Sequence, residues 1–90
     1  MSQEIKLNIY SIKDSVTGEF GALTFSPTDA VVLRDLSIEL QYSPEKSKIK
    51  ARPGDFALYK LGTFGINTGT IEPCNPDFVA SLQDLIEVKV

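Results

Sequence analysis

Two stretches of the chain repeat one pattern: IYSIKDSVTGEFG at residues 9–21 and LYKLGTFGINTGTI at residues 58–71. Each has an apolar residue, a tyrosine, a polar residue and another apolar residue, followed by a turn that ends in Thr-Gly and by a returning run. A glycine that closes such a turn supplies the positive φ that a short β-hairpin requires. The repeat therefore predicts two hairpins, with Tyr10 and Tyr59 in equivalent places.

A helix is predicted between the two hairpins. Ser26 suits the N-cap, Pro27 suits the first helical position, and Asp29 follows three residues after the cap. We expect the helix to run to about Tyr42, because Pro44 ends it. Its apolar face follows helical spacing and comprises Val32, Leu33, Leu36 and Leu40.

The remaining segments complete the predicted fold. The polar stretch 45–54 is expected to form a loop, and Asn75-Pro76-Asp77 predicts the start of a short helix over about 76–84. Residues 86–90 alternate apolar and charged side chains, which is also typical of an edge strand. We therefore predict an α+β fold in a single domain, residues 1–90: two hairpins form a small antiparallel sheet packed by one central helix, with a short C-terminal helix or strand.

Composition limits the class of protein. The chain has 90 residues, is 42% hydrophobic and has a formal net charge of −3. A chain of this length buries roughly 60–65% of its unfolded surface, so we expect a small core and a homodimer. The N-terminus has no apolar signal core and no apolar run approaches the ~20 residues of a membrane helix, which favours a soluble cytosolic protein without membrane contact.

No catalytic or metal-binding motif is found in the sequence. The chain has no histidine, a single cysteine, and no glycine-rich phosphate loop or calcium loop. Its acidic residues show no ligand-like spacing. We therefore expect no enzymatic activity, no catalytic residues, no metal and no cofactor. Cys74 is expected to be a small buried thiol that forms no intramolecular disulfide.

A row of basic residues is the sharpest candidate for a binding site. Four cations recur at every second position, so an extended chain would project them to one side. Such a row suits a phosphate backbone, with Tyr59 to stack on a base. The candidate nucleic-acid-binding residues are Lys46, Lys48, Lys50, Arg52, Tyr59 and Lys60. The alternative is a solvated polar loop, and the acidic net charge weighs against strong DNA binding.

The aromatic side chains are assigned mainly to the core. The five phenylalanines fall in strand or helix patterns and are expected to be buried: Phe20, Phe25, Phe56, Phe64 and Phe78. Tyr10 and Tyr59 fit two interpretations equally, as partly exposed residues or as pillars of the core.

The order of motifs resembles the small nonstructural protein of gokushovirus-type microviruses, which are tailless phages with a circular single-stranded DNA genome. The resemblance covers residues 8–72 and is most specific in DFALYKLGTF at residues 55–64, supported by Tyr10–Asp14, Thr17-Gly18 and the helix start at 26–33. Ser11 stands where many relatives have an acid, and the basic row at 46–52 has no counterpart in the family pattern.

The resemblance implies a nonstructural phage protein that acts in the cytoplasm of the infected bacterium, in single-stranded genome synthesis or in DNA packaging. The family has no assigned catalytic residues. The partner expected first is single-stranded DNA. The alternative is a protein-interaction module that binds the phage replication initiator or a host replication factor, and an exposed apolar patch around Ile38 or Ile66 would favour it.

Overall fold

The computed structural model describes residues 5–44 and 47–86 of the chain. Four strands and three α-helices lie in these ranges, together with one 3₁₀ turn, η2. In chain order they are β1 (Lys6–Asp14), β2 (Glu19–Ser26), α1 (Asp29–Tyr42), α2 (Ser47–Ala51), η2 (Pro53–Asp55), β3 (Phe56–Gly65), β4 (Ile71–Ser81) and α3 (Leu82–Ile86).

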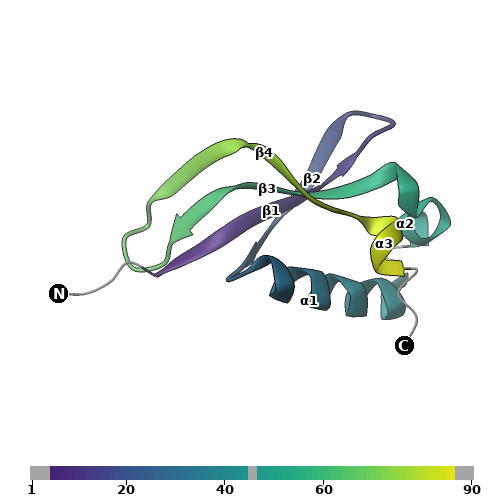
Figure 1. Cartoon of the computed structure of the whole chain (residues 1–90), viewed down its shortest axis with the longest axis horizontal. Helices are drawn as coiled ribbons and strands as arrows, with labels where there is room; N and C mark the ends of the chain where they lie inside the picture. Colours follow the sequence, from purple (N-terminus) through teal and green to yellow (C-terminus); the bar gives the residue numbers. More distant parts are fainter. Residues whose placement is uncertain (1–4, 45–46, 87–90) are drawn as a thin grey trace.

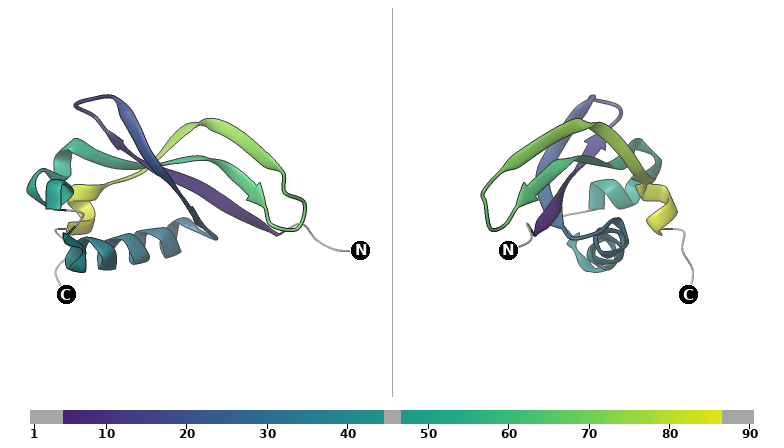
Figure 2. Two further views of the ribbon diagram at one scale, coloured as in Figure 1. Left: turned by 180° about the vertical axis from the view of Figure 1, so that it is seen from behind. Right: turned by 60° about the vertical axis from the view of Figure 1, so that its left-hand side comes forward.

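The four strands form one antiparallel sheet in the order β2-β1-β3-β4. Helix α1 runs along one face of this sheet, and α2 and α3 gather at the end of the sheet near the C-terminus of α1 (Figure 1). The two further views show no helix over the opposite face (Figure 2). The predicted α+β architecture, two hairpins on one central helix with a short C-terminal helix, is confirmed. We call the uncovered side of the sheet the open face.

Both predicted hairpins form, and their closing glycines have the expected conformation. Gly18 ends the first turn with φ 78° and Gly69 ends the second with φ 73°. In each turn the glycine N–H donates to a carbonyl four residues earlier, Gly18 to Asp14 and Gly69 to Gly65, at 2.7 and 2.8 Å. The Thr-Gly pair of the repeat therefore marks a real turn in both copies.

Helix α1 begins two residues later than the sequence predicts. The N-cap is Thr28, whose hydroxyl accepts a hydrogen bond from the Val31 N–H at 3.2 Å, and Ser26 is instead the last residue of β2. Thr28 has an extended backbone, which suits a cap, and Pro27 lies outside the helix. The helix ends at Tyr42 as predicted.

Two predictions for the second half of the chain are wrong. Residues 47–51 form α2, because Ile49 packs into the core and draws its neighbours into a helical turn. Residues 76–81 continue β4 and form no helix, because Phe78 pairs with Tyr59 and Ala80 pairs with Leu58. The helix predicted near the C-terminus starts only at Leu82. The edge strand predicted at 86–90 falls largely on residues 87–90, outside the described residues.

The core lies between α1 and the covered face of the sheet. Tyr10 is fully buried there, and its hydroxyl donates to Asp29 Oδ1 at 2.5 Å and accepts from Asn8 Nδ2 at 2.9 Å. Burial and the Asp29 carboxylate raise the pKa of Tyr10 to about 12. The hydroxyl ties the start of α1 to β1. The other buried core residues are Val32, Leu36, Leu40, Ile49, Leu58 and Leu82.

Tyr10 and Tyr59 are not equivalent, although the sequence repeat aligns them. Across β1 and β3 the partner of Tyr59 is Ser11, and the partner of Tyr10 is Lys60. Because successive residues of a strand point to opposite faces, this one-residue offset puts Tyr10 on the covered face and Tyr59 on the open face. Tyr59 is therefore not part of the core between the sheet and α1.

The molecule is elongated, with extents of 48 × 30 × 20 Å and a radius of gyration of 14.0 Å. A compact domain of this length has a radius of gyration of about 12 Å. The excess arises because the β3–β4 hairpin extends beyond the N-terminal end of α1 (Figures 1 and 2). Much of the sheet is thus left uncovered by a helix.

Candidate nucleic-acid interface

Aromatic side chains gather on the open face. Phe20 of β2, Tyr59 of β3 and Phe78 of β4 lie in a row across the sheet. The ring centroids of Phe20 and Tyr59 are 5.6 Å apart, and those of Tyr59 and Phe78 are 5.8 Å apart. Both pairs meet edge to face, at interplanar angles of 81° and 82°. The rings therefore hold one another in fixed orientations.

A lysine lies over this row. Lys13 Nζ is 5.5 Å from the ring centroid of Phe20 and 5.8 Å from that of Tyr59, within range of a cation–π contact. Among the described residues Lys13 has no carboxylate within ion-pair distance. Its charge is therefore available to an anion that approaches the rings.

A second aromatic pair continues the face toward the far end of the sheet. The rings of Phe25 on β2 and Phe64 on β3 are 5.8 Å apart. Residues 59 and 64 are separated by five positions, so regular alternation would put them on opposite faces. A β-bulge between them puts both on the same face. Ile9 pairs with Gly62 and Tyr10 pairs with Lys60, which leaves Leu61 as an extra residue in β3. We call the five rings and Lys13 the aromatic face.

The aromatic face corrects the prediction that all five phenylalanines are buried. Phe20 is 38% exposed, Phe25 is 46% exposed and Phe78 is 58% exposed. Phe56 and Phe64 are half-buried. A single helix covers only one face of the sheet, so within the described residues the apolar side chains that alternate onto the other face pack mainly against one another, and several stay partly exposed.

The basic row has a different geometry from the one predicted. Because residues 47–51 are helical, Lys48 and Lys50 do not project to one side, and Ile49 between them is buried. Lys50 Nζ donates to the Gln41 carbonyl at 3.3 Å, and Arg52 pairs with Asp55 at 3.6 Å. Lys46 lies outside the described residues. The prediction of an extended row of cations that follows a phosphate backbone is therefore wrong. Any role of these residues in DNA binding stays a prediction.

Of the candidate residues that the structure describes, only Tyr59 lies on the aromatic face. Lys60 is its neighbour in β3 and thus points to the opposite face, where its strand partner is Asp77. Sequence reasoning missed Lys13, Phe20 and Phe78. A signal existed for Lys13 and Phe20: both belong to the first copy of the repeat, and the turn between them brings them opposite one another as a strand pair.

The single cysteine lies away from the aromatic face, on the outer strand β4. Cys74 is exposed on β4, not buried as predicted, because β4 is an edge strand and Cys74 lies where its pairing with β3 is interrupted. No cluster of three or more potential metal ligands occurs among residues 5–44 and 47–86. No helix in these ranges is long and apolar enough to cross a membrane.

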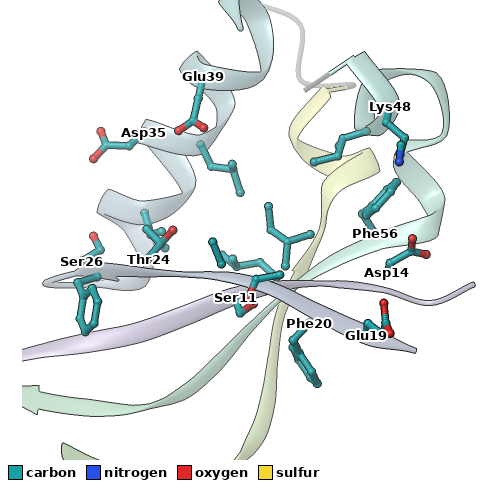
Figure 3. A pocket seen from close by; sticks show the side chains of 18 of the residues that line it. Ser11, Asp14, Glu19, Phe20, Thr24, Ser26, Asp35, Glu39, Lys48 and Phe56 are labelled. Carbon is teal, nitrogen blue, oxygen red and sulfur yellow. Dashed lines mark hydrogen bonds between the residues drawn. The ribbon is translucent and has the colours of Figure 1, made fainter. Parts of the chain in front are cut away.

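A groove of about 490 Å³ opens between β2 and α1, and Phe20 and Phe25 of the aromatic face are among its lining residues. Its floor is apolar, and Asp14, Glu19, Asp35 and Glu39 line it together with one cation, Lys48 (Figure 3). We call it the β2–α1 groove. Its acidic lining repels phosphates, so the aromatic face is the better candidate for a nucleic acid.

Comparison with known families gives one match. Residues 7–85 match the model of a family described as Phage ORF5 protein. The match spans β1 through most of α3, and so includes both the aromatic face and the β2–α1 groove. No curated protein and no solved structure matches the chain.

Proposed function

Because the chain belongs to the phage ORF5 protein family, we propose that it is a non-enzymatic phage accessory protein that binds single-stranded DNA through the aromatic face. It would act in the cytoplasm of the infected bacterium, in genome synthesis or packaging, as the resemblance to the gokushovirus-type nonstructural protein implies. The observation behind this proposal is the row of three rings, two of them exposed, with Lys13 over Phe20 and Tyr59.

The chemistry of the aromatic face suits single strands better than duplex DNA. Unpaired bases stack on aromatic side chains, and each stacked base contributes about 1–3 kcal/mol without regard to sequence. Phe20 and Phe78 flank Tyr59 and are exposed, so both offer ring surface to a base. Lys13 lies within reach of a phosphate between two such bases.

The charge of the aromatic face predicts how the affinity for single-stranded DNA should depend on salt concentration. A row of about five cations would give a steep salt dependence, whereas Lys13 alone releases about one counterion, a logarithmic slope near −0.7 for a single strand. Binding that depends on rings should therefore be modest in affinity and nearly insensitive to salt. This separates the aromatic face from the basic residues at 46–52.

Titration with an oligo-dT at two salt concentrations tests the proposal. Phe78→Ala should weaken binding about tenfold, because a stacking surface is lost. Tyr42→Ala is the matched control, since Tyr42 is an exposed aromatic residue on α1 and lies away from the aromatic face. No detectable binding at ~50 mM salt, or equal loss in both variants, would overturn the proposal.

Neutralising Lys48, Lys50 and Arg52 together tests the contribution of the basic segment. If these residues bind phosphates, the triple variant should flatten the salt dependence; if only the aromatic face binds, the affinity should stay unchanged. Light scattering with and without the oligonucleotide measures the mass in the same samples and tests the predicted homodimer.

The alternative function is a protein-interaction module for a replication protein. An exposed apolar surface is its main support, and the aromatic face supplies one, with Leu23 and Ile71 exposed as well. Ile38 and Ile66, singled out from the sequence, are each about half exposed but lie on α1 and in the β3–β4 turn, apart from one another. Retention of a phage or host replication protein on the wild type, lost in Phe78→Ala while oligo-dT does not bind, would favour this function.

A further inference from the structure

From Phe20 to Ser26 the outer edge of β2 lacks two of the features that usually prevent a sheet edge from pairing, charges and prolines, and it has one bulge, between Phe20 and Leu23. Residues 20–26, Phe-Gly-Ala-Leu-Thr-Phe-Ser, contain neither a charge nor a proline. β2 is the first strand of the sheet and pairs only with β1 among the described strands. Charged side chains, prolines and bulges are the common ways to block such an edge. An uncharged edge with a single bulge is still suited to accept another strand.

The β2–α1 groove lies beside this edge and has room for the side chains of an added strand. The floor of the β2–α1 groove is apolar, with Ile12, Leu36 and Ile49 among its lining residues. Figure 3 shows Thr24 on the groove side of β2 and Phe20 on the opposite side. A strand laid along β2 would therefore direct every second side chain toward the groove and the others toward the aromatic face.

The charge around the groove specifies what kind of strand fits. Four carboxylates line it, Asp14 and Glu19 at the first hairpin and Asp35 and Glu39 on α1, and Lys48 is the one cation of the lining. Asp35 is also paired with Arg34, whose Nε lies 3.2 Å from Asp35 Oδ1, so the excess negative charge is carried mainly by Asp14 and Glu19 at the first hairpin. The Asp14 carboxylate accepts the Val16 N–H at 2.9 Å, which fixes it in place without neutralising it. An occupant with lysine or arginine next to apolar side chains complements this pattern.

A second copy of the chain fits less well. If β2 paired with β2 of another copy, the side chains offered to the groove would come from its own covered side, such as Glu19, Thr24 and Ser26. These are small or acidic. They would leave the apolar floor unfilled and add carboxylates to an acidic lining.

We propose that the β2 edge and the β2–α1 groove form a docking site for a cationic, apolar peptide segment of a partner protein, which adds to the sheet as a fifth strand. Backbone hydrogen bonds to β2 supply part of the affinity, apolar side chains enter the groove, and basic side chains meet the carboxylates. Phe20 and Phe25 belong both to the lining of this groove and to the aromatic face, but the proposal does not depend on DNA binding.

A designed peptide tests the proposal. The probe is an acetylated, amidated octapeptide, Lys-Thr-Leu-Thr-Lys-Thr-Leu-Thr, which as a strand presents lysine and leucine alternately on one face. Titrated into the ¹⁵N-labelled full chain, it should shift the amide signals of residues 19–26 and of the part of α1 around Asp35. A version with glutamate in place of lysine should bind at least tenfold more weakly.

Paired variants locate the site. Glu19→Gln combined with Asp35→Asn should weaken peptide binding about fivefold and reduce its salt dependence. The matched control, Glu72→Gln with Asp77→Asn, removes two charges from the opposite edge and should leave binding unchanged. Two N-methylated probes, one methylated at every threonine and one at every lysine and leucine, test strand addition, because one set of amides must face β2.

Three outcomes would overturn the proposal. Equal binding of the lysine and glutamate peptides removes the charge argument. Full binding by both N-methylated probes removes the added strand. Concentration-dependent broadening of residues 19–26 without any peptide would assign the edge to a second copy of the chain. Oligo-dT affinity in the Glu19→Gln/Asp35→Asn variant reports the aromatic face separately, so the two proposals can fail independently.

Discussion

The two hairpins begin from nearly the same sequence and end as different surfaces. The β3–β4 hairpin forms an edge that carries Pro73 and Pro76, two acidic residues and two irregularities of register. The β1–β2 hairpin forms an edge with no proline, with no charge after Glu19 and with one irregularity of register. By these features the first edge is better protected against the addition of a strand than the second. The comparison shows that a repeated turn motif sets strand pairing but leaves the use of each edge to the returning strand.

The largest predicted difference between the hairpins concerns one glycine in each. At Gly62 of β3, φ is 157°, and a Cβ would collide with the Glu72 carbonyl oxygen and lie 3.0 Å from Pro73 Cα. Gly62→Ala should therefore lower the free energy of unfolding by about 3 kcal/mol. Gly21→Ala in β2 should change it by less than about 1 kcal/mol, since the added atom meets only Ile12 O at 3.6 Å. Urea unfolding of both variants measures this, and equal losses would contradict the comparison.

The two tyrosines of the repeat should differ next. Tyr10→Phe removes the hydrogen bond to Asp29 from a fully buried position and should cost about 1–2 kcal/mol of unfolding free energy. Tyr59→Phe should be nearly neutral, because within the described residues its hydroxyl has no hydrogen-bond partner and its ring contacts are kept. Thermal unfolding of the pair decides the point. A larger loss for Tyr59→Phe would mean that the tyrosine in the second hairpin is the structural one.

The same pair predicts a dependence on pH. The folded pKa of Tyr10 is about 12, above the value of about 10 expected in an unfolded chain. The stability that its protonated form contributes is therefore complete below pH 10 and is lost as the pH rises toward 12. Wild type and Tyr59→Phe should lose stability over this range, and Tyr10→Phe should lose less. Unfolding free energies at pH 9 and pH 11.5 measure the difference, and parallel declines in all three proteins would refute it.

The smallest effect on stability is predicted at the edges themselves. Leu23→Lys on β2 and Ile71→Lys on β4 replace exposed apolar residues, so each should change the unfolding free energy by less than about 0.5 kcal/mol. Their effect on association should differ: Leu23→Lys places a charge on the less protected edge and should slow aggregation, whereas Ile71→Lys should not. Light scattering at rising concentration compares them, and equal aggregation rates would show that β2 is no more open than β4.

The sequence was sufficient to predict the parts of the fold that depend on local chemistry. The Thr-Gly turns and the apolar spacing of α1 need only neighbouring residues, so both hairpins and the end of the helix at Tyr42 are as predicted. Segment 47–51 and residues 76–81 were assigned wrongly, because long-range partners determine their structure: Ile49 enters the core, and Phe78 pairs with Tyr59. Local helix and turn signals cannot report such pairing.

The candidate site could be predicted only in part. Tyr59 was identified from the repeat, but its companions depend on register: Lys13 and Phe20 meet across one strand pair, and Phe78 joins them across another. Which face of the sheet α1 covers decides whether a phenylalanine is core or surface, and periodicity alone does not reveal this. The alternating charges at 46–52 predict a one-sided basic row only if the backbone is extended. Residues 47–51 are helical, so the row does not form as predicted.

Leu61, the extra residue in β3, has a consequence for how related chains diverge. It acts as a phase shift: the residues before it and after it present their aromatic rings to the same side only because one position is inserted between them. Removal of that single residue would turn Phe64 to the opposite face from Tyr59 and break its contact with Phe25. A one-codon deletion here would thus alter the outer chemistry of the protein more than most substitutions, with its amino-acid composition almost unchanged.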